Sequence, residues 1–233
     1  MASISCQHIY KIYPGATAPS VTDFNLEIQD KEFIIFVGPS GCGKSTTLRM
    51  IAGLEEISGG EMYIGDRLIN DVPPKDRDIA MVFQSYALYP HMTVYKNIAF
   101  GLELRKTPKD EIDKLVREAA KILGIEQLLN RKPKALSGGQ RQALTLLMAS
   151  LKQPKLLLLD EPAAGMNPEE TLALMDLIRE IRDRFDLTVL IIEHHMDLVM
   201  NVSDRIFVLN FGKPLAEGTP AEIQSNPEVI EAY

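Results

Sequence analysis

Five short runs of mostly apolar residues divide the chain, and segments with helical periodicity lie between most of them. The runs are EFIIFVG (32–38), DIAMVFQ (78–84), KLLLLDE (155–161), LTVLIIE (187–193) and RIFVLN (205–210). A strand without apolar–polar alternation is typical of a sheet that is covered on both faces. Helices are expected at 45–53, after 137, from 168 and from about 196. This order predicts an α/β fold with a mainly parallel sheet and helices on both sides.

Other parts of the chain depart from this alternation. ISCQHIYKIY (4–13) and VTDFNLEIQ (21–29) have strand character, and EMYIGDRLI (61–69) is typical of a hairpin. Residues from about 93 to 131 are charged and helical in pattern, and KDEIDKLVREAAKILGI (109–125) is strongly amphipathic. We therefore expect an inserted helical lobe. After residue 210 a short hairpin and one terminal helix are expected.

The composition narrows the class of protein. The 233 residues, 45% of them hydrophobic, suit one large globular domain or one domain with an inserted lobe. The net charge of −7 argues against nucleic acid as a partner, because phosphate binding favours a basic face. Cys6 and Cys42 form no disulfide framework and are expected to be reduced thiols. We expect neither a signal peptide nor a membrane span, because no apolar run reaches about 18 residues.

A glycine-rich stretch, GPSGCGKST (38–46), comes directly after the first apolar run. Its glycines allow backbone N–H groups to form one concavity, and the helix behind it adds its positive N-terminal end. The lysine is placed to reach the β- and γ-phosphates of a nucleotide, and the serine hydroxyl to hold Mg²⁺. A plain glycine turn is the alternative, but the strand before and the helix after favour a triphosphate site. The predicted nucleotide-binding residues here are Gly38, Pro39, Ser40, Gly41, Cys42, Gly43, Lys44, Ser45 and Thr46.

Two acidic residues come directly after the apolar run LLLL. Asp160 ends the expected strand, where a carboxylate is placed to bind Mg²⁺. Glu161 is placed to orient or deprotonate an attacking water. The alternative is a strand end with two solvated acids, and the presence of the glycine loop favours the catalytic interpretation.

A second candidate anion site lies at LSGGQRQ (136–142). Ser137 is expected to cap the helix that begins there, whose first N–H groups Gly138 and Gly139 expose, and Gln140 completes the motif. One triphosphate does not need two anion sites on one chain. A head-to-tail pair of chains does, because each chain then completes the site of the other.

The glycine loop, LSGGQ and the Asp–Glu pair, in this order, resemble the ATPase subunits of ABC transporters over essentially the whole chain. The resemblance implies a RecA-like P-loop core, an antiparallel β subdomain and a helical lobe. It also implies the cofactors ATP and Mg²⁺ and a dimer around two ATP molecules. A single domain is expected over 1–233, with the core and β subdomain at about 1–88 and 150–233 and the lobe at about 89–149.

The resemblance assigns further roles. Gln84 matches the glutamine that senses Mg²⁺ and the attacking water, and it is expected to be a catalytic and metal-site residue. His194 matches the switch histidine at the γ-phosphate, with the neighbouring His195 as the weaker choice. Tyr13 is the best match for the aromatic residue that stacks on adenine, with Tyr10 as the alternative. Each could instead be an ordinary loop, structural or core residue.

The two halves of the chain resemble different relatives. Residues up to KPKALSGGQRQ are similar to the ATPases of carbohydrate importers, whereas the residues from LLLLDEPAAGMNP to the C-terminus are similar to those of branched-chain amino-acid importers. The join, QALTLLMASLKQP (142–154), matches neither, which suggests an engineered or naturally mosaic sequence. Asn167 stands where the family usually has Asp, so its role across a dimer is open.

These features favour an ATP-hydrolysing motor subunit that powers the import of a sugar or an amino acid. The expected partners are a second copy of the chain and transmembrane permease subunits, and the membrane is met only through the permease. The expected location is the cytoplasmic face of the inner or plasma membrane. The alternatives are a cassette that binds nucleotide but hydrolyses it weakly and has no natural permease, and an ABC ATPase of translation or repair. A small-molecule kinase would have no use for LSGGQ.

Overall fold

A six-stranded sheet forms the centre of the molecule. The computed structural model describes residues 3–83, 88–194, 199–200 and 202–232. Five strands are parallel and the last is antiparallel to its neighbour. In spatial order they are β6 (Ile79–Val82), β7 (Leu156–Asp160), β8 (Thr188–Ile192), β3 (Phe33–Val37), β9 (Arg205–Asn210) and β10 (Lys213–Gly218). The mainly parallel sheet predicted from the apolar runs is confirmed.

The central strands are almost entirely apolar, as expected for a sheet that is covered on both faces. Every residue of β3, β7 and β8 is buried. Along β3, Phe33, Ile35 and Val37 belong to one hydrophobic cluster, whereas Ile34 and Phe36 belong to the other. Since successive side chains of a strand point to opposite faces, two separate cores lie on the two sides of one sheet.

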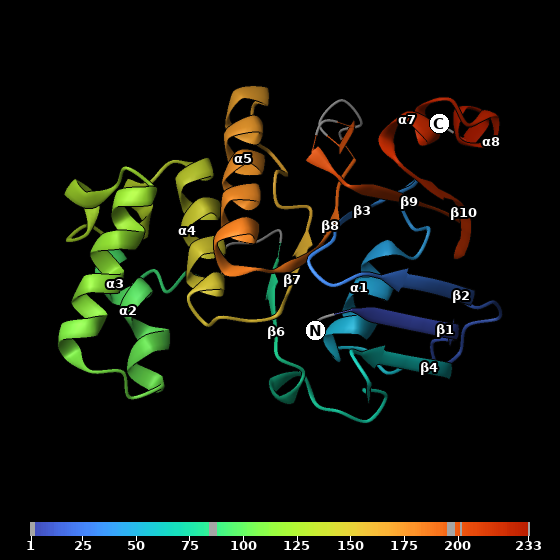
Figure 1. Cartoon of the computed structure of the whole chain (residues 1–233), viewed down its shortest axis with the longest axis horizontal. Coiled ribbons are helices and arrows are strands. Elements are labelled where there is room, and N and C mark those ends of the chain that lie inside the picture. The colour runs from blue at the N-terminus through green and yellow to red at the C-terminus, as the bar shows by residue number, and fades with distance from the viewer. Residues whose placement is uncertain (1–2, 84–87, 195–198, 201, 233) are drawn as a thin grey trace.

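A smaller antiparallel sheet covers one of these faces together with α1 (Lys44–Ala52). Its strands, in spatial order, are β2 (Val21–Ile28), β1 (Ile4–Lys11), β4 (Gly59–Ile64) and β5 (Arg67–Leu68). Ile64 pairs with Arg67, so the predicted hairpin turns at residues 65–66. Figure 1 shows this sheet beside α1, on the side of the molecule opposite to the green helices.

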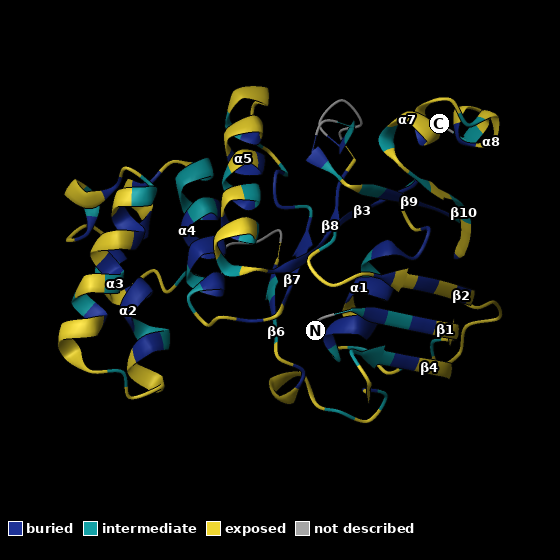
Figure 2. Ribbon diagram, viewed as in Figure 1, coloured by how far each residue is buried: buried dark blue, intermediate teal, exposed yellow. Residues whose placement is uncertain are grey.

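The other face carries α4 (Gly138–Ser150) and α5 (Pro168–Phe185), and α2 (Val94–Leu104) and α3 (Lys109–Ile122) extend the same hydrophobic cluster, with α2 in contact with α4 and α3. The amphipathic stretch predicted as a helix is α3, whose buried residues include Ile112 and Val116. Figure 2 shows α5 with a buried side toward the sheet and an exposed side toward solvent. In the part of the chain that the structure describes, three short 3₁₀ turns connect the elements: η1 (Pro74–Asp76), η2 (Glu126–Leu128) and η3 (Pro133–Ala135).

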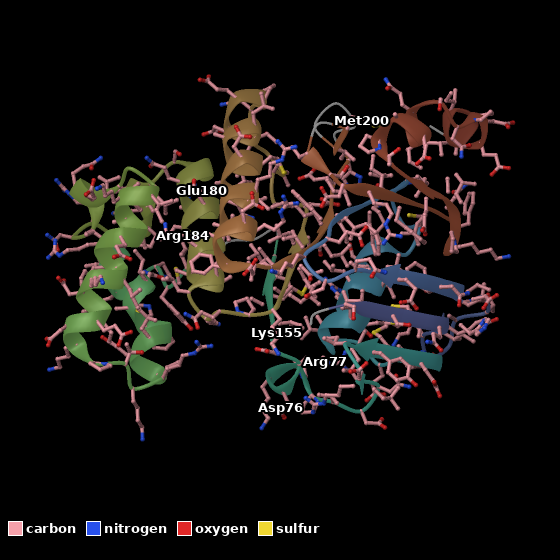
Figure 3. The ribbon with its side chains drawn as sticks, viewed as in Figure 1. Asp76, Arg77, Lys155, Glu180, Arg184 and Met200 are labelled. Atoms are coloured by element: carbon pink, nitrogen blue, oxygen red, sulfur yellow. The ribbon has the colours of Figure 1, made fainter. Side chains whose placement is uncertain are left out.

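Arg77 ties the β6 segment to the end of α1 (Figure 3). Its guanidinium is buried and donates to the carbonyls of Met50 at 2.8 Å, Ile51 at 2.9 Å and Val72 at 2.7 Å. Carbonyls in the last turn of a helix have no partner within the helix, so a cation here satisfies them. Burial lowers the pKa of Arg77 from its ordinary value.

The C-terminal end differs from the prediction in two ways. The strand RIFVLN is itself half of the hairpin, because β9 pairs with β10. The expected terminal helix is two helices, α7 (Pro220–Gln224) and α8 (Pro227–Ala232). Pro227 lacks an N–H and disfavours helical backbone at Asn226, so the helix is interrupted there. The helix expected from about 196 begins outside the described residues, and no described helix is long and apolar enough to cross a membrane.

Candidate nucleotide site

The glycine loop leaves the carboxyl end of β3 and passes into α1 within a narrow space. Gly38 has φ +147°, and a Cβ there would lie 2.2 Å from the carbonyl oxygen of Leu209. Gly43 has φ +100°, and a Cβ there would lie 2.9 Å from the carbonyl oxygen of Ser20. Larger residues would collide at both positions. The loop is therefore held against β9 and against the start of β2.

Lys44 begins α1, and its ammonium group turns back into the loop. The side chain is 5% exposed, and Nζ donates to the carbonyls of Gly38 at 2.7 Å and Pro39 at 3.0 Å. Cys42 is also buried in the loop, with its Sγ 3.6 Å from Nζ. Ser40 and Gly41 form the exposed tip, and Thr46 is partly buried in α1. A single cation thus lies at a helix N-terminus that carries no acidic residue in its first turn.

Ser45 and Asp160 meet across the gap between α1 and β7. The Ser45 hydroxyl donates to Oδ1 of Asp160 at 3.2 Å. Burial raises the pKa of the Asp160 carboxyl above its ordinary value, and the hydrogen bond from Ser45 opposes this shift. Two adjacent oxygen donors suit Mg²⁺, which takes few protein ligands and completes its shell with water and phosphate. No cluster of three or more His, Cys, Asp or Glu side chains exists among the described residues to hold a metal without such help.

Glu161 and His194 form a direct contact at the ends of β7 and β8. His194 Nε2 lies 2.5 Å from Oε1 of Glu161, and both side chains are partly exposed. Glu161 has φ +49°, which is uncommon for a residue with a side chain, and its N–H donates to Ile192 at 3.1 Å. Backbone strain of this kind persists only where surrounding contacts hold it. The carboxyl ends of three adjacent parallel strands therefore carry the loop, the acidic pair and the histidine.

LSGGQ lies apart from the glycine loop within one chain. Ser137 caps α4 as predicted: its Oγ accepts from Gln140 N–H at 3.2 Å, and its own N–H donates to the Gln140 side chain at 3.0 Å. Gly138 and Gly139 form the first turn. Figure 1 shows α4 beyond α5, on the opposite side from α1. The structure therefore does not bring the two candidate anion sites together in one chain.

The other predicted residues have different outcomes. Tyr13 is partly buried beyond the end of β1, and one face of its ring lies 4.7 Å from Nζ of Lys11. Its role at adenine stays a prediction. Gln84 and His195 lie outside the described residues, so their predicted roles also stay untested. Asn167 has a local task that the sequence reasoning did not identify: its side chain accepts from Glu170 N–H at 2.9 Å and caps α5.

Glu193 is a buried acid of the site that sequence reasoning missed. Its side chain is 2% exposed and lies between the end of β8 and residue 163. The available signal was an acidic residue at the end of an otherwise apolar run, directly before His194. Acids are rarely buried unless they are paired, so this position indicates a specific function.

A lysine-bearing glycine loop between a buried parallel strand and a helix, with an Asp–Glu pair two strands away, defines the chain as a P-loop NTPase. Residues 21–164 match the family described as ABC transporter, so the chain belongs to this family. Residues 213–233 match the family described as branched-chain amino acid ATP-binding cassette transporter.

Relatives support the family and the fold. The chain is 55% identical over 230 residues to the oligosaccharides import ATP-binding protein MsmX of Bacillus subtilis, and the match covers 99% of this chain but only 63% of that protein. In structure it resembles MJ1267, an ATP-binding cassette of an ABC transporter, with a TM-score of 0.89, 26% identity and coverage of 100% and 99%. It also resembles the dimeric, post-hydrolysis cassette MJ0796 bound to ADP and Pi, with a TM-score of 0.82, 28% identity and coverage of 93% and 98%. The fold is the RecA-like fold of ABC cassettes, as predicted.

Proposed function

We propose that the chain binds and hydrolyses ATP as the motor subunit of an ABC importer. The observation that carries this proposal is the convergence of four side chains beside the glycine loop. Ser45 contacts Asp160, and Glu161 contacts His194, at the carboxyl ends of neighbouring parallel strands. This edge is where parallel α/β sheets bind their ligands.

Binding of the triphosphate uses the loop and the start of α1. Backbone N–H groups of residues 40–46 and the helix N-terminus would face the β- and γ-phosphates, and Lys44 would exchange its loop carbonyls for the phosphate oxygens. Ser45 and Asp160 would hold Mg²⁺, which neutralises phosphate charge when it is bound. Gln84 is proposed to assist at the metal, and Tyr13 to stack on adenine.

Hydrolysis requires a water held in line with the γ-phosphate. Glu161 is proposed to orient this water and to take its proton, because its carboxylate is partly exposed beside the loop. His194, whose Nε2 contacts that carboxylate, is proposed to fix the direction of Glu161 and to lie beside the γ-phosphate. Catalysis then depends mainly on positioning and electrostatics.

A second copy of the chain completes each site. The N-terminus of α4 is an anion site for which its own chain has no phosphate, and a head-to-tail pair would place Ser137, Gly138, Gly139 and Gln140 against the γ-phosphate of the partner. The dimeric state named for the cassette MJ0796 supports this arrangement.

The decisive experiment measures the ATP hydrolysis rate of the purified chain against its own concentration. We expect a rate that rises faster than linearly, because the active site needs two chains, and a loss of about 100-fold or more in Glu161→Gln. Lys44→Ala is the binding control, and it should weaken ATP affinity without unfolding the chain.

Two results would contradict the proposal in different ways. A folded chain with no hydrolysis above Glu161→Gln would favour the alternative, a cassette that binds nucleotide without acting as a motor. A rate strictly proportional to concentration down to nanomolar chain would overturn the composite site.

A groove between β6, α2 and α4 is the proposed contact with the permease. It measures about 420 Å³ and is mainly apolar. Tyr89 and Phe100 stack edge to face with ring centroids 4.9 Å apart, and Leu104 on its rim is 70% exposed. Exposed apolar surface of this kind marks interaction sites. A sugar-importer permease is proposed as its partner, and the chain would then sit on the cytoplasmic face of the membrane.

We further infer a composite sequence. The branched-chain match at 213–233 gives it weak support, because it covers only the C-terminal end. The likeness to the oligosaccharide importer protein extends over 230 residues and therefore across the join at 142–154. The support for a branched-chain importer origin thus comes from the C-terminal end alone. Whether the mixture is engineered or natural does not alter the proposed activity.

A further inference from the structure

Glu193 connects the two strands that carry the proposed catalytic pair. It comes directly after β8, and its own N–H donates to the carbonyl of Phe36 at 3.2 Å, which fixes its backbone against β3. The side chain points inward and is 2% exposed. A carboxylate in such a place is costly unless hydrogen bonds satisfy it.

Both oxygens of this carboxylate accept backbone hydrogen bonds from the site. Oε1 accepts from the N–H of Ala163 at 3.1 Å, and Oε2 accepts from the N–H of His194 at 3.1 Å. Ala163 is two residues after Glu161, in a turn closed by the bond from Ala164 N–H to the Glu161 carbonyl at 3.1 Å. One side chain thus holds the backbone of both segments whose side chains meet at 2.5 Å.

The strained backbone of Glu161 makes this link important. Its φ of +49° needs surrounding contacts to persist, and the turn at 163–164 is one of them. A displacement of about 1 Å at a reacting group costs about 100-fold in rate. Glutamine at position 193 has one acceptor oxygen and one NH₂ group. It could accept from only one of the two backbone N–H groups, and its NH₂ group would face the other.

We propose that Glu193 is a positioning residue for hydrolysis, which sets the Glu161–His194 geometry and couples it to the turn at 163–166. The inference rests on the proposed ATPase function. The carboxylate of Glu193 is buried and accepts from the backbone of Ala163 and His194, so we expect it to act on the chemical step and to leave nucleotide binding unchanged.

The test compares Glu193→Gln with the wild-type chain. We expect kcat to fall about 10- to 100-fold while KM and the measured ATP affinity stay within about twofold, since only the alignment changes. In a His194→Ala background, Glu193→Gln should cause little further loss, because the two residues act as one unit. Glu228→Gln on exposed α8 makes the same chemical change and should behave as wild type.

A second readout does not depend on turnover. The ¹⁵N resonance of His194 Nε2 should move in Glu193→Gln toward its position in Glu161→Gln, because both changes loosen the same contact. Wild-type kcat in Glu193→Gln, losses that add fully in the double variant, or an unmoved resonance would overturn the proposal. A wild-type chain without hydrolysis would instead overturn the ATPase function, and the resonance would still show whether Glu193 sets the Glu161–His194 contact.

Discussion

At the scale of a single residue, opposing effects set the pKa of Asp160. Burial disfavours its charge, whereas the hydroxyl of Ser45 at 3.2 Å and the nearby cations favour it. The raised pKa means that folding is opposed by the buried charge above that pKa and that this cost disappears as pH falls through it. Acid unfolding is therefore not expected to begin at Asp160. The consequence of its raised pKa should appear in metal binding.

As the pH is lowered, Mg²⁺ affinity should begin to fall at a higher pH than it would with an aspartate of ordinary pKa. Mg²⁺ binds the deprotonated carboxylate, so a proton competes with it from a higher pH when the pKa is raised. We expect the Mg²⁺-dependent gain in ATP affinity to begin to shrink at a higher pH than an aspartate of ordinary pKa, 3.8, would give, and to be small and flat in Asp160→Asn. Titrations with and without Mg²⁺ measure this gain, with exposed Asp176→Asn as control. The same slope in Asp160→Asn would assign the effect to another group.

The sequence predicted residues that a motif names and missed those that only the fold brings together. Lys44, Ser45, Asp160 and Glu161 stand at fixed spacings beside predicted strand ends, so their types and order were informative. The bond from Ala163 to Glu193 joins residues 30 positions apart, and no local pattern encodes it.

At the scale of elements, the central strands β3, β7 and β8 were predictable because both of their faces are buried. Helix ends were predictable where a cap exists, as at Ser137, whose side chain bonds to Gln140. The split of the terminal helix was missed because one proline outweighs the propensity of its neighbours.

The helix α4 contains an unusual polar residue in the join between the two resemblances. Gln142 is 1% exposed, and neither its Oε1 nor its Nε2 has a hydrogen-bond partner among the described residues. An unsatisfied buried amide costs roughly 1–3 kcal/mol. It lies one turn from Thr145, on a helix that packs against β6 and α5.

Replacing Gln142 by methionine should therefore stabilise the protein. The side chains are similar in length, so Gln142→Met removes the unpaired amide with little change in packing, and we expect the free energy of unfolding to rise by about 1–2 kcal/mol. Denaturant unfolding of the nucleotide-free chain measures it. Gln127→Met, at an exposed position, should change stability by less than about 0.5 kcal/mol. A less stable Gln142→Met would mean that the amide has a partner after all.

At the scale of the whole molecule, the layers could be predicted and the strand order could not. Alternating strands and helices imply a parallel sheet, but the placement of β3 between β8 and β9 depends on crossovers that leave no mark in local periodicity. The sequence predicted that LSGGQ and the glycine loop serve different nucleotides, because one triphosphate needs only one anion site on a chain. The chain arrangement in Figure 1 agrees with that inference.

Expression of this chain in a cell that lacks a relative tests whether it can power transport in place of that relative. The chain shares 55% identity with MsmX of Bacillus subtilis over 230 residues, although it spans only 63% of that protein. We expect its expression to restore growth on an oligosaccharide in a strain that lacks MsmX, because the groove beside α2 and α4 presents the surface that a sugar permease would contact. Lys44→Ala should not restore growth, because it loses nucleotide binding. Leu104→Asp should fail differently, with ATP hydrolysis retained in the purified chain, since it charges an exposed rim of the groove. Growth with Leu104→Asp equal to wild type would remove the groove from the interface, and no growth with an active wild-type ATPase would exclude this class of permease as the partner.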